Sequence, residues 1–229
     1  MIKYRLEITK GEPIRYISHL DFASLMQRAI CRAHLPAAYS EGFNPHMKIA
    51  FASALSVGIT SSSEFMDLEL HKDLCQPEVF EKLSNTLPPG VKLLQVKQVD
   101  LRAKALMSIV DEGSYIITLP LAKLTDTLEQ INTAIDKLNH ADEIIIVRQT
   151  PKKRKEIEIK QYLATPLTFT ADEENLILNL NIKITPTGTA KPHEFLLALN
   201  EKFNLHLPVD EALVERTGLY HEGKSLIDL

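Results

Sequence analysis

The stretch that most constrains the fold is an amphipathic helix pattern near the N-terminus. Apolar residues recur at intervals of 3, 4, 7 and 8 from Phe22 to Ala33, which is the spacing of one face of an α-helix. Ser18 precedes this pattern as an expected N-cap, with Asp21 three residues later in a shorter version of the capping box. Pro36 ends the helix. The sequence therefore predicts one well-bounded helix that buries a single side.

The residues around this helix alternate between polar and apolar side chains, which is the pattern of half-buried β-strands. The expected elements are, in chain order, a strand at 2–9, the helix, strands at 48–59 and 65–70 around a hairpin loop at 60–63, a helix at 77–87 and a strand at 91–99. Strand, helix, strand, strand, helix, strand is the order of a split βαβ, or ferredoxin-like, unit. We expect such a unit over residues 1–100.

A similar order follows a charge-rich junction near residues 101–112. The expected elements are a strand at 115–119, a helix at 124–138, a strand at 143–148, a basic turn at 151–155, strands at 156–162, 165–170 and 175–184, a helix at 192–203 and a last strand at 213–220. The predicted fold class is α+β, with two tandem ferredoxin-like (βαββαβ) units, of which the second, residues 113–229, is decorated.

Composition places the chain among globular proteins, with 45% apolar and 24% charged residues in 229 positions. No run of 18 apolar residues occurs, so no membrane span is expected, and the first residues lack the apolar core of a signal peptide. Cys31 and Cys75 are far apart without CxxC spacing, which argues against a disulfide framework or a thiolate zinc site. We expect a cytoplasmic protein.

The net charge of −4 is unevenly distributed along the chain. Residues 1–60 carry seven Lys and Arg against four Asp and Glu, a local excess of positive charge. Arg28 and Arg32, four positions apart, share a helix face outside the apolar stripe, and Arg15 and Lys48 belong to the same region. These four cations form a candidate phosphate-binding patch, and a solvated charged face is the alternative.

His19 and His46 are the candidates for acid–base chemistry. His19 lies in the first helical turn, where the helix dipole lowers the pKa of an imidazolium, so a neutral His19 near Arg15 can act as general base on a ribose hydroxyl. The alternative is structural, with His19 contacting backbone at the helix entry and His46 closing a turn. Together with Asp21 these histidines suit zinc or iron in type, but the spacing matches no recurring site, and we expect no metal and no cofactor.

The stretch from Arg15 to Glu64 resembles a bacterial radical-SAM-linked family, a domain of unknown function found beside or fused to radical S-adenosylmethionine proteins. The residues that carry the resemblance are Arg15, Ser18-His19-Leu20-Asp21, Arg28-Ala29, Arg32-Ala33, Leu35-Pro36, Ser40, Gly42-Phe43-Asn44-Pro45-His46, Gly58 and Glu64. Weaker matches to the family pattern occur at Lys191-Pro192-His193-Glu194 and Arg216-Thr217-Gly218-Leu219-Tyr220, with Lys191 where the family pattern has Arg. The chain lacks a CxxxCxxC motif, so the resemblance implies the partner of a radical enzyme rather than the enzyme itself.

The first functional expectation is an RNA-binding accessory protein that presents tRNA or rRNA to a radical SAM modification enzyme. Its expected RNA contacts are Arg15, Ser18, Asp21, Arg28, Arg32, Ser40, Gly42, Asn44, Lys48, Lys191 and Arg216. One alternative is a metal-independent RNA endonuclease that uses His19 and His46, by analogy with CRISPR repeat-processing enzymes of tandem ferredoxin-like architecture. The other alternative is a small-molecule or protein-docking module.

Overall fold

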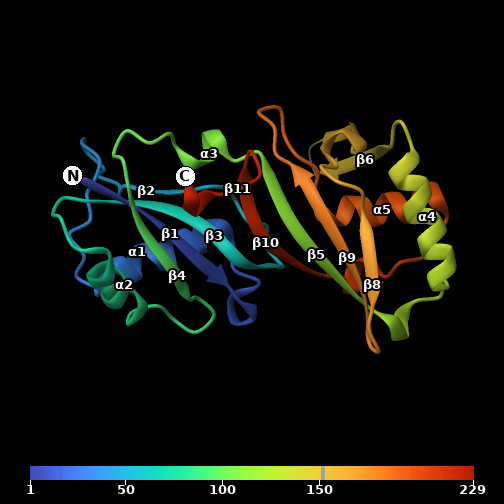
Figure 1. Ribbon diagram of the computed structural model, residues 1–229, viewed down its shortest axis with the longest axis horizontal. Helices are drawn as coiled ribbons and strands as arrows, with labels where there is room; N and C mark the ends of the chain where they lie inside the picture. The colour runs from blue at the N-terminus through green and yellow to red at the C-terminus, as the bar shows by residue number, and fades with distance from the viewer. Residues whose placement is uncertain (151–152) are drawn as a thin grey trace. The chain divides into compact units, whose positions relative to one another are not determined.

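A computed structural model describes residues 1–150 and 153–229 and divides them into two compact units (Figure 1). The first unit comprises Met1–Val110 and Arg216–Leu229, and the second comprises Asp111–Glu215. The elements of the first unit are β1 (Ile2–Lys10), α1 (His19–Arg32), β2 (Ile49–Phe51), β3 (Ile59–Leu70), α2 (Gln76–Ser84), β4 (Leu93–Val99), α3 (Leu106–Ile109) and β11 (Lys224–Ser225). Strand β10 (Leu213–His221) begins in the second unit and continues into the first.

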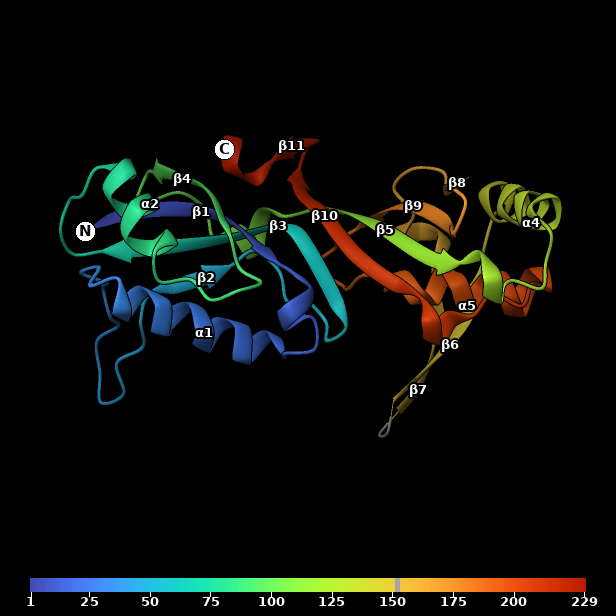
Figure 2. The same ribbon diagram turned by 90° about the horizontal axis from the view of Figure 1, so that it is seen from below.

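The sheet of the first unit is built on β1, which pairs antiparallel with β3 on one side and with β4 on the other. Strands β2 and β10 both lie beside the opposite edge of β3, and β4 is an edge strand. Helix α1 runs along one face of this sheet (Figure 2). The core between them contains side chains from α1, α2, β1 and β3, among them Phe22, Met26, Val79, Leu83, Tyr4, Leu6, Ile8, Met66 and Leu68.

The opposite face of the sheet is also covered in part. Arg5 of β1 forms a buried ion pair with Asp67 of β3, its register partner, with Nε 2.9 Å from Oδ1. The Arg5 guanidinium also donates to the carbonyl of Leu226, 2.8 Å away, in the C-terminal 3-10 turn Leu226–Asp228. The C-terminal segment therefore returns to the first unit and closes over this charged pair.

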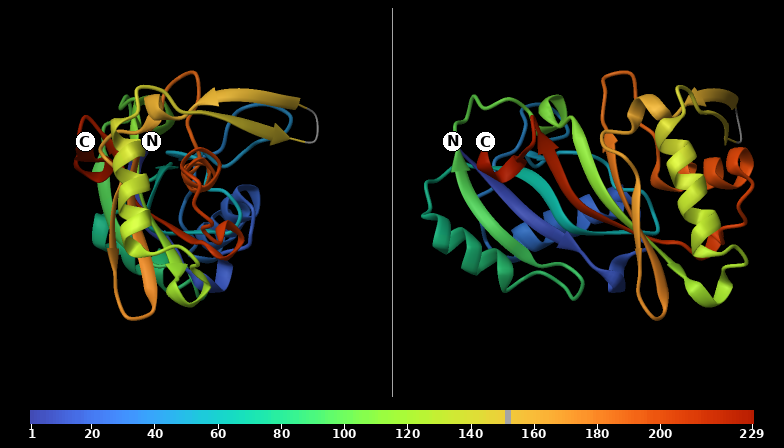
Figure 3. Two further views of the ribbon diagram at one scale, coloured as in Figure 1. Left: turned by 90° about the vertical axis from the view of Figure 1, so that its right-hand side faces the viewer. Right: turned by 45° about the vertical axis from the view of Figure 1, so that its right-hand side comes forward.

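The second unit contains β5 (Glu112–Pro120), α4 (Leu128–His140), β6 (Ile145–Thr150), β7 (Lys153–Glu158), β8 (Thr168–Ala171), β9 (Asn175–Lys183) and α5 (Pro192–Phe203). Strands β5, β9 and β8 form an antiparallel sheet in that order. Strands β6 and β7 form a separate antiparallel ribbon (Figure 3). Helix α4 begins at a capping box between Thr127 and Gln130.

The α+β class is confirmed, but tandem ferredoxin-like units are not. In the second unit the predicted strands are divided, because β5, β9 and β8 pair with one another whereas β6 and β7 form a separate two-stranded ribbon. The predicted hairpin loop at 60–63 is also wrong, because these residues lie within β3, and the strand predicted at 48–59 is limited to Ile49–Phe51. Three consecutive serines and a threonine resemble a turn in composition, yet Ser61 is buried and its hydroxyl donates to the carbonyl of Arg216, 3.0 Å away.

Two further expectations concern the second unit and membranes. The basic turn expected at 151–155 lies partly outside the described residues, since only 153–155 are described, as the start of β7. The strand expected at 156–162 ends at Glu158. Among the helices of the described ranges, none has the length and apolarity that a membrane span needs.

Candidate functional site

Most of the predicted site residues of the first unit lie near one end or the other of helix α1. We call the group near the N-terminal end the ionic cluster and define it as Lys10, Arg15, His19, Glu64 and Arg216. We call the depression along the C-terminal half the basic groove, and it is lined by Gln27, Arg28, Cys31, Arg32, Tyr39, Pro45, His46 and Met47. Lys191 belongs to neither, because it lies in the second unit.

The centre of the ionic cluster is a buried ion pair between Glu64 of β3 and Arg216 of β10. Both side chains are 2% exposed. The pair is bidentate, with Arg216 Nε 2.6 Å from Glu64 Oε1 and Nη2 bonded to Oε2. Arg216 Nη1 also donates to the hydroxyl of Ser53 at 3.3 Å. A buried carboxylate requires such a partner, because desolvation of an unpaired charge is costly.

Lys10 and Arg15 are also buried, and both hold the chain segment that enters α1. Lys10 Nζ donates to the carbonyls of Arg15, Ile17 and Ile59 at 2.9, 3.3 and 3.2 Å. Burial lowers the pKa of Lys10, and the nearby carboxylate of Glu64 opposes this shift. The Arg15 guanidinium pairs with Glu12, with Nε 2.8 Å from Oε2.

His19 is the first residue of α1 and lies half-buried against Phe51, with ring centroids 5.1 Å apart at 78°, an edge-on contact. Burial lowers the pKa of His19, Glu64 opposes this shift, and Arg216 and Lys10 reinforce it. The neutral imidazole is therefore the stable form at neutral pH. Because the cations around it bond to carboxylates or carbonyls, the cluster anchors the helix entry rather than offering positive charge to a ligand.

The predicted N-cap is confirmed at the same end of the helix. The hydroxyl of Ser18 accepts a hydrogen bond from the backbone N–H of Asp21 at 3.1 Å and donates to Asp21 Oδ2 at 2.6 Å. Ser18 is thus engaged locally, and Asp21 completes a short cap rather than a metal site. Within the described residues no group of three His, Cys, Asp or Glu side chains is placed to hold a metal ion.

The basic groove differs in charge from the ionic cluster. It has a volume of about 530 Å³, and none of its lining residues, all of them described, is acidic. Arg28 is exposed and has no ion pair in the described part of the chain. Arg32 donates one hydrogen bond, from Nη2 to the carbonyl of Thr86 at 2.8 Å, which leaves other guanidinium N–H groups for a ligand.

The loop that forms the other side of the groove is closed by its own hydrogen bonds. The N–H of Ser40 donates to the carbonyl of His46 at 2.8 Å, and the N–H of His46 donates to the hydroxyl of Ser40 at 2.9 Å. Gly42 has φ +120°, a conformation that other residues rarely adopt, and Asn44 is exposed beside it. Ser40 and Gly42 therefore shape the loop, and His46 at its end lines the groove together with Arg28 and Arg32 of α1. Figure 2 shows this segment as the blue loop that follows α1.

The remaining predicted residues do not join the groove. Lys48 pairs with Glu69, with Nζ 3.4 Å from Oε2, and lines a different, smaller pocket. Lys191 is the N-cap residue of α5, and its backbone N–H donates to Glu194, which in turn pairs with Arg148. The single patch of Arg15, Arg28, Arg32 and Lys48 is therefore corrected: the groove unites only Arg28 and Arg32 with His46.

The shared site for His19 and His46 is corrected as well. His46 lies in the groove with Arg28, whereas His19 lies among the residues of the ionic cluster. Arg28 follows His19 by nine positions in the helix, which is roughly 13.5 Å along the axis at 1.5 Å per residue. Two imidazoles that serve different ends of one helix do not act together on a single ribose hydroxyl.

Several residues at these two places had no functional role in the sequence-based prediction. Tyr39 and Cys31 line the groove, and Lys10 and Phe51 contact the ionic cluster. The sequence did contain a signal that Lys10 is buried. It occupies the position where the alternation of β1 would place another apolar side chain after Ile8. The others depend on contacts between segments distant in sequence.

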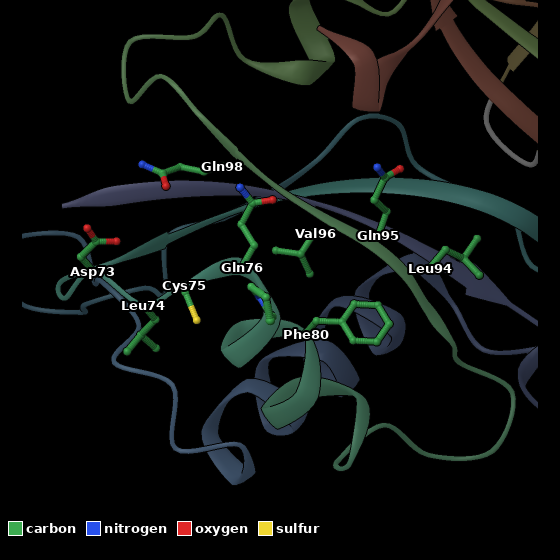
Figure 4. Close-up of a pocket in the computed structure, with 10 residues that line it drawn as sticks. Asp73, Leu74, Cys75, Gln76, Phe80, Leu94, Gln95, Val96 and Gln98 are labelled. Carbon is green, nitrogen blue, oxygen red and sulfur yellow. The ribbon is translucent and has the colours of Figure 1, made fainter.

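A larger groove of the first unit lies elsewhere, between α2 and the edge strand β4, with a volume of about 1030 Å³ (Figure 4). Its lining includes the exposed apolar side chains of Phe80 and Leu94, and Asp73 is its one ionisable carboxyl group in the described chain. No Lys or Arg belongs to its described lining, so it is a poor site for phosphate.

Comparisons with known proteins place the chain in a family. The family model described as an uncharacterized protein conserved in bacteria, DUF2344, matches residues 3–192, and the chain belongs to this bacterial family. No curated protein matches the chain.

Among solved structures, the chain is similar to one in a crystal structure of a Cbf5-Nop10-Gar1 complex, with a TM-score of 0.50 and 7% sequence identity. The match covers 96% of this chain and 50% of the solved chain, so the present chain spans half the length of that protein. At this identity the similarity concerns the fold alone.

Proposed function

We propose that this protein binds RNA through the basic groove and serves as an accessory to a radical SAM enzyme that modifies tRNA or rRNA in the cytoplasm. The observation that supports RNA binding is that the cations of the groove have few bonds to other protein groups. Arg28 has no ion pair among the described residues, Arg32 has one carbonyl contact, and neither has an acidic neighbour in the groove lining.

Two guanidinium groups four residues apart on a helix repel each other by about 0.2–0.5 kcal/mol. A phosphate between Arg28 and Arg32 would relieve this repulsion and accept charge-assisted, bidentate hydrogen bonds. His46 on the opposite side of the groove adds a polar group that can donate to or accept from a ribose or base. The groove thus has the charge and the hydrogen-bonding groups for a sugar–phosphate backbone.

The radical SAM link rests on the sequence resemblance from Arg15 to Glu64, since the description of the matched family names no enzyme. We also propose that the first unit is ferredoxin-like, since β1 pairs antiparallel with β3 and β4 and side chains of both α1 and α2 pack into one core against this sheet. The endonuclease alternative is less favoured, since it requires His19 and His46 at one site and only His46 lines the groove.

The test is a binding titration of the purified protein with fluorescently labelled tRNA at several salt concentrations. Two phosphate contacts give a slope of about −1.4 in log affinity against log salt, so a fourfold rise in salt weakens binding roughly sevenfold. An A260/A280 ratio of the freshly purified protein well above that of protein alone would support the same conclusion. Absent or salt-independent binding would overturn the RNA-binding function and leave a docking module as the better interpretation.

A further inference from the structure

Phe43 stands at the tip of the loop that borders the basic groove, and the fold makes no use of its side chain. Its relative exposure is 107%, so the ring is fully in solvent. Within the described residues the ring contacts are His19 with Phe51 and Phe22 with Phe51, and Phe43 takes part in neither. Exposure of one large apolar side chain is common, but here it is combined with a loop whose base is closed by hydrogen bonds.

The conformation of this loop is set by specific interactions. The two hydrogen bonds between Ser40 and His46 close its base, and Tyr39 and Met47 form a backbone bridge below them. Gly42, with φ +120°, turns the chain immediately before Phe43. The closed base limits the conformations open to the segment that carries Phe43, which lowers the entropy that would be lost when the ring binds a flat partner.

A second aromatic ring belongs to the groove itself. Tyr39 lines the groove beside Cys31 and is 45% exposed. Two causes raise the pKa of Tyr39: a hydrogen bond with the Cys31 side chain, which is the larger, and burial. The phenol therefore stays neutral at physiological pH. One closed loop thus carries two accessible aromatic rings, and the helix opposite carries the guanidinium groups of Arg28 and Arg32.

We propose that the ligand of the groove is single-stranded RNA, whose phosphates contact Arg28 and Arg32 while its unpaired bases stack on Phe43 and Tyr39. This inference rests on the proposed RNA-binding function and specifies its substrate class. Aromatic side chains stack only on bases whose faces are free, and a duplex buries those faces between neighbouring base pairs. Cationic groups beside aromatic platforms are the combination by which proteins bind single strands without reading their sequence.

The alternative occupant of an exposed aromatic tip is another protein. The groove favours the nucleic acid, because a neutral apolar partner would leave the charges of Arg28 and Arg32 without compensation, whereas each nucleotide supplies both a base and a phosphate. Arg28, Arg32 and Tyr39 line the groove, and Phe43 follows Tyr39 by four residues in the loop that borders it.

The experiment compares a labelled single-stranded RNA 12-mer of mixed sequence with the same RNA annealed to its complement. The proteins are wild type, Phe43→Ala, Phe43→Leu and Phe43→Tyr, with Tyr16→Ala as the matched control, because Tyr16 is 75% exposed but lies at the entry to α1, away from the groove. Since Phe43 is fully exposed, its substitution leaves the thermal unfolding midpoint unchanged.

The expected result is a wild-type preference for the single strand of tenfold or more. Phe43→Ala should weaken single-strand binding roughly 5- to 150-fold, the range for loss of one stacked base. Phe43→Leu should lose as much, since it keeps apolar character but cannot stack, whereas Phe43→Tyr and Tyr16→Ala should bind like wild type. The salt dependence should stay the same in all of these variants.

Two contrary outcomes are distinguishable. Equal binding of both RNAs, with Phe43→Ala unaffected and the salt dependence retained, would overturn the single-strand proposal but leave RNA binding intact. No binding of either RNA by the wild type would overturn the proposed function together with this inference.

Discussion

Cationic side chains lie near both ends of helix α1, but the two ends differ in whether these cations are paired with acidic groups of the protein. At the N-terminal end, Arg216 and Arg15 pair with Glu64 and Glu12, and Lys10 donates to three backbone carbonyls. Along the C-terminal half, Arg28 has no ion pair within the described residues and lies in a groove without acidic lining. The first arrangement stabilises the fold, and the second leaves positive charge for a ligand.

This difference shows that the availability of a cation depends on its partners and not on its residue type or its position near a histidine. The partner of Arg216 is 152 positions away in sequence. Charge counts along the chain weigh Arg15 and Arg28 equally, yet only one of them is exposed. The following predictions test the contrast, beginning with the largest expected effect.

Glu64→Gln should cost about 3–5 kcal/mol of unfolding free energy, because it leaves the Arg216 guanidinium buried without a negative partner. The measurement is urea unfolding followed by circular dichroism. Glu41→Gln is the matched control, since Glu41 is exposed on the loop and its substitution should change stability by less than about 0.5 kcal/mol. Equal effects of the two substitutions would refute the structural role of the cluster.

Ser18→Ala should cost about 1 kcal/mol, within a usual range of about 0.5–2, because the backbone N–H of Asp21 loses its acceptor at the N-terminus of α1. Ser18→Thr retains the hydroxyl and should remain close to wild type. Thermal unfolding of both variants measures the difference. A Ser18→Ala protein with unchanged stability and reduced RNA affinity would instead identify Ser18 as a ligand contact.

The smallest effect concerns pH. Burial lowers the pKa of His19, with Glu64 opposing and Arg216 and Lys10 reinforcing the shift, so the unfolded chain binds this proton first. As the pH falls below about 6.5, the ordinary pKa of histidine, protonation of His19 in the unfolded chain lowers the free energy of unfolding. This loss continues until the pH reaches the lower pKa of His19 in the folded state. His19→Gln should lose less stability than wild type between pH 7.5 and 5.5, as measured by urea unfolding.

His71→Gln provides the control for this comparison, because it removes an exposed imidazole, and the effect of His19→Gln should exceed the effect of this control. If His19→Gln and wild type lose the same stability over this range, the imidazole of His19 is not held neutral by its surroundings in the folded protein.

The features that could be predicted from sequence are those that short-range patterns determine. The helical stripe from Phe22 to Ala33, the Ser18 cap and the alternation of β1 all depend on residues within a few positions of one another. The same periodicity places Arg28 and Arg32 on one helix face, and both line the groove. The α+β class follows from these local elements.

The features that were missed depend on contacts between distant segments. Thr60 to Ser63 looked like a turn because their polar side chains are usually solvated, but β1 and β10 flank this part of β3 and bury Thr60 and Ser61. No local pattern indicates that the segment from Arg216 onward belongs with the first unit, or that Glu64 is its buried partner. The separation of His19 from His46 likewise follows from how the loop folds against the helix.

The most direct test of the contrast between the two ends of α1 is the salt dependence of RNA binding in charge-matched variants. Arg28→Ala/Arg32→Ala removes two cations from the groove, and Arg102→Ala/Lys104→Ala removes two exposed cations elsewhere in the first unit. The groove variant should lose about 1.4 from the slope of log affinity against log salt, while the control keeps the wild-type slope. Equal slopes for the two variants would contradict the assignment of phosphate binding to Arg28 and Arg32.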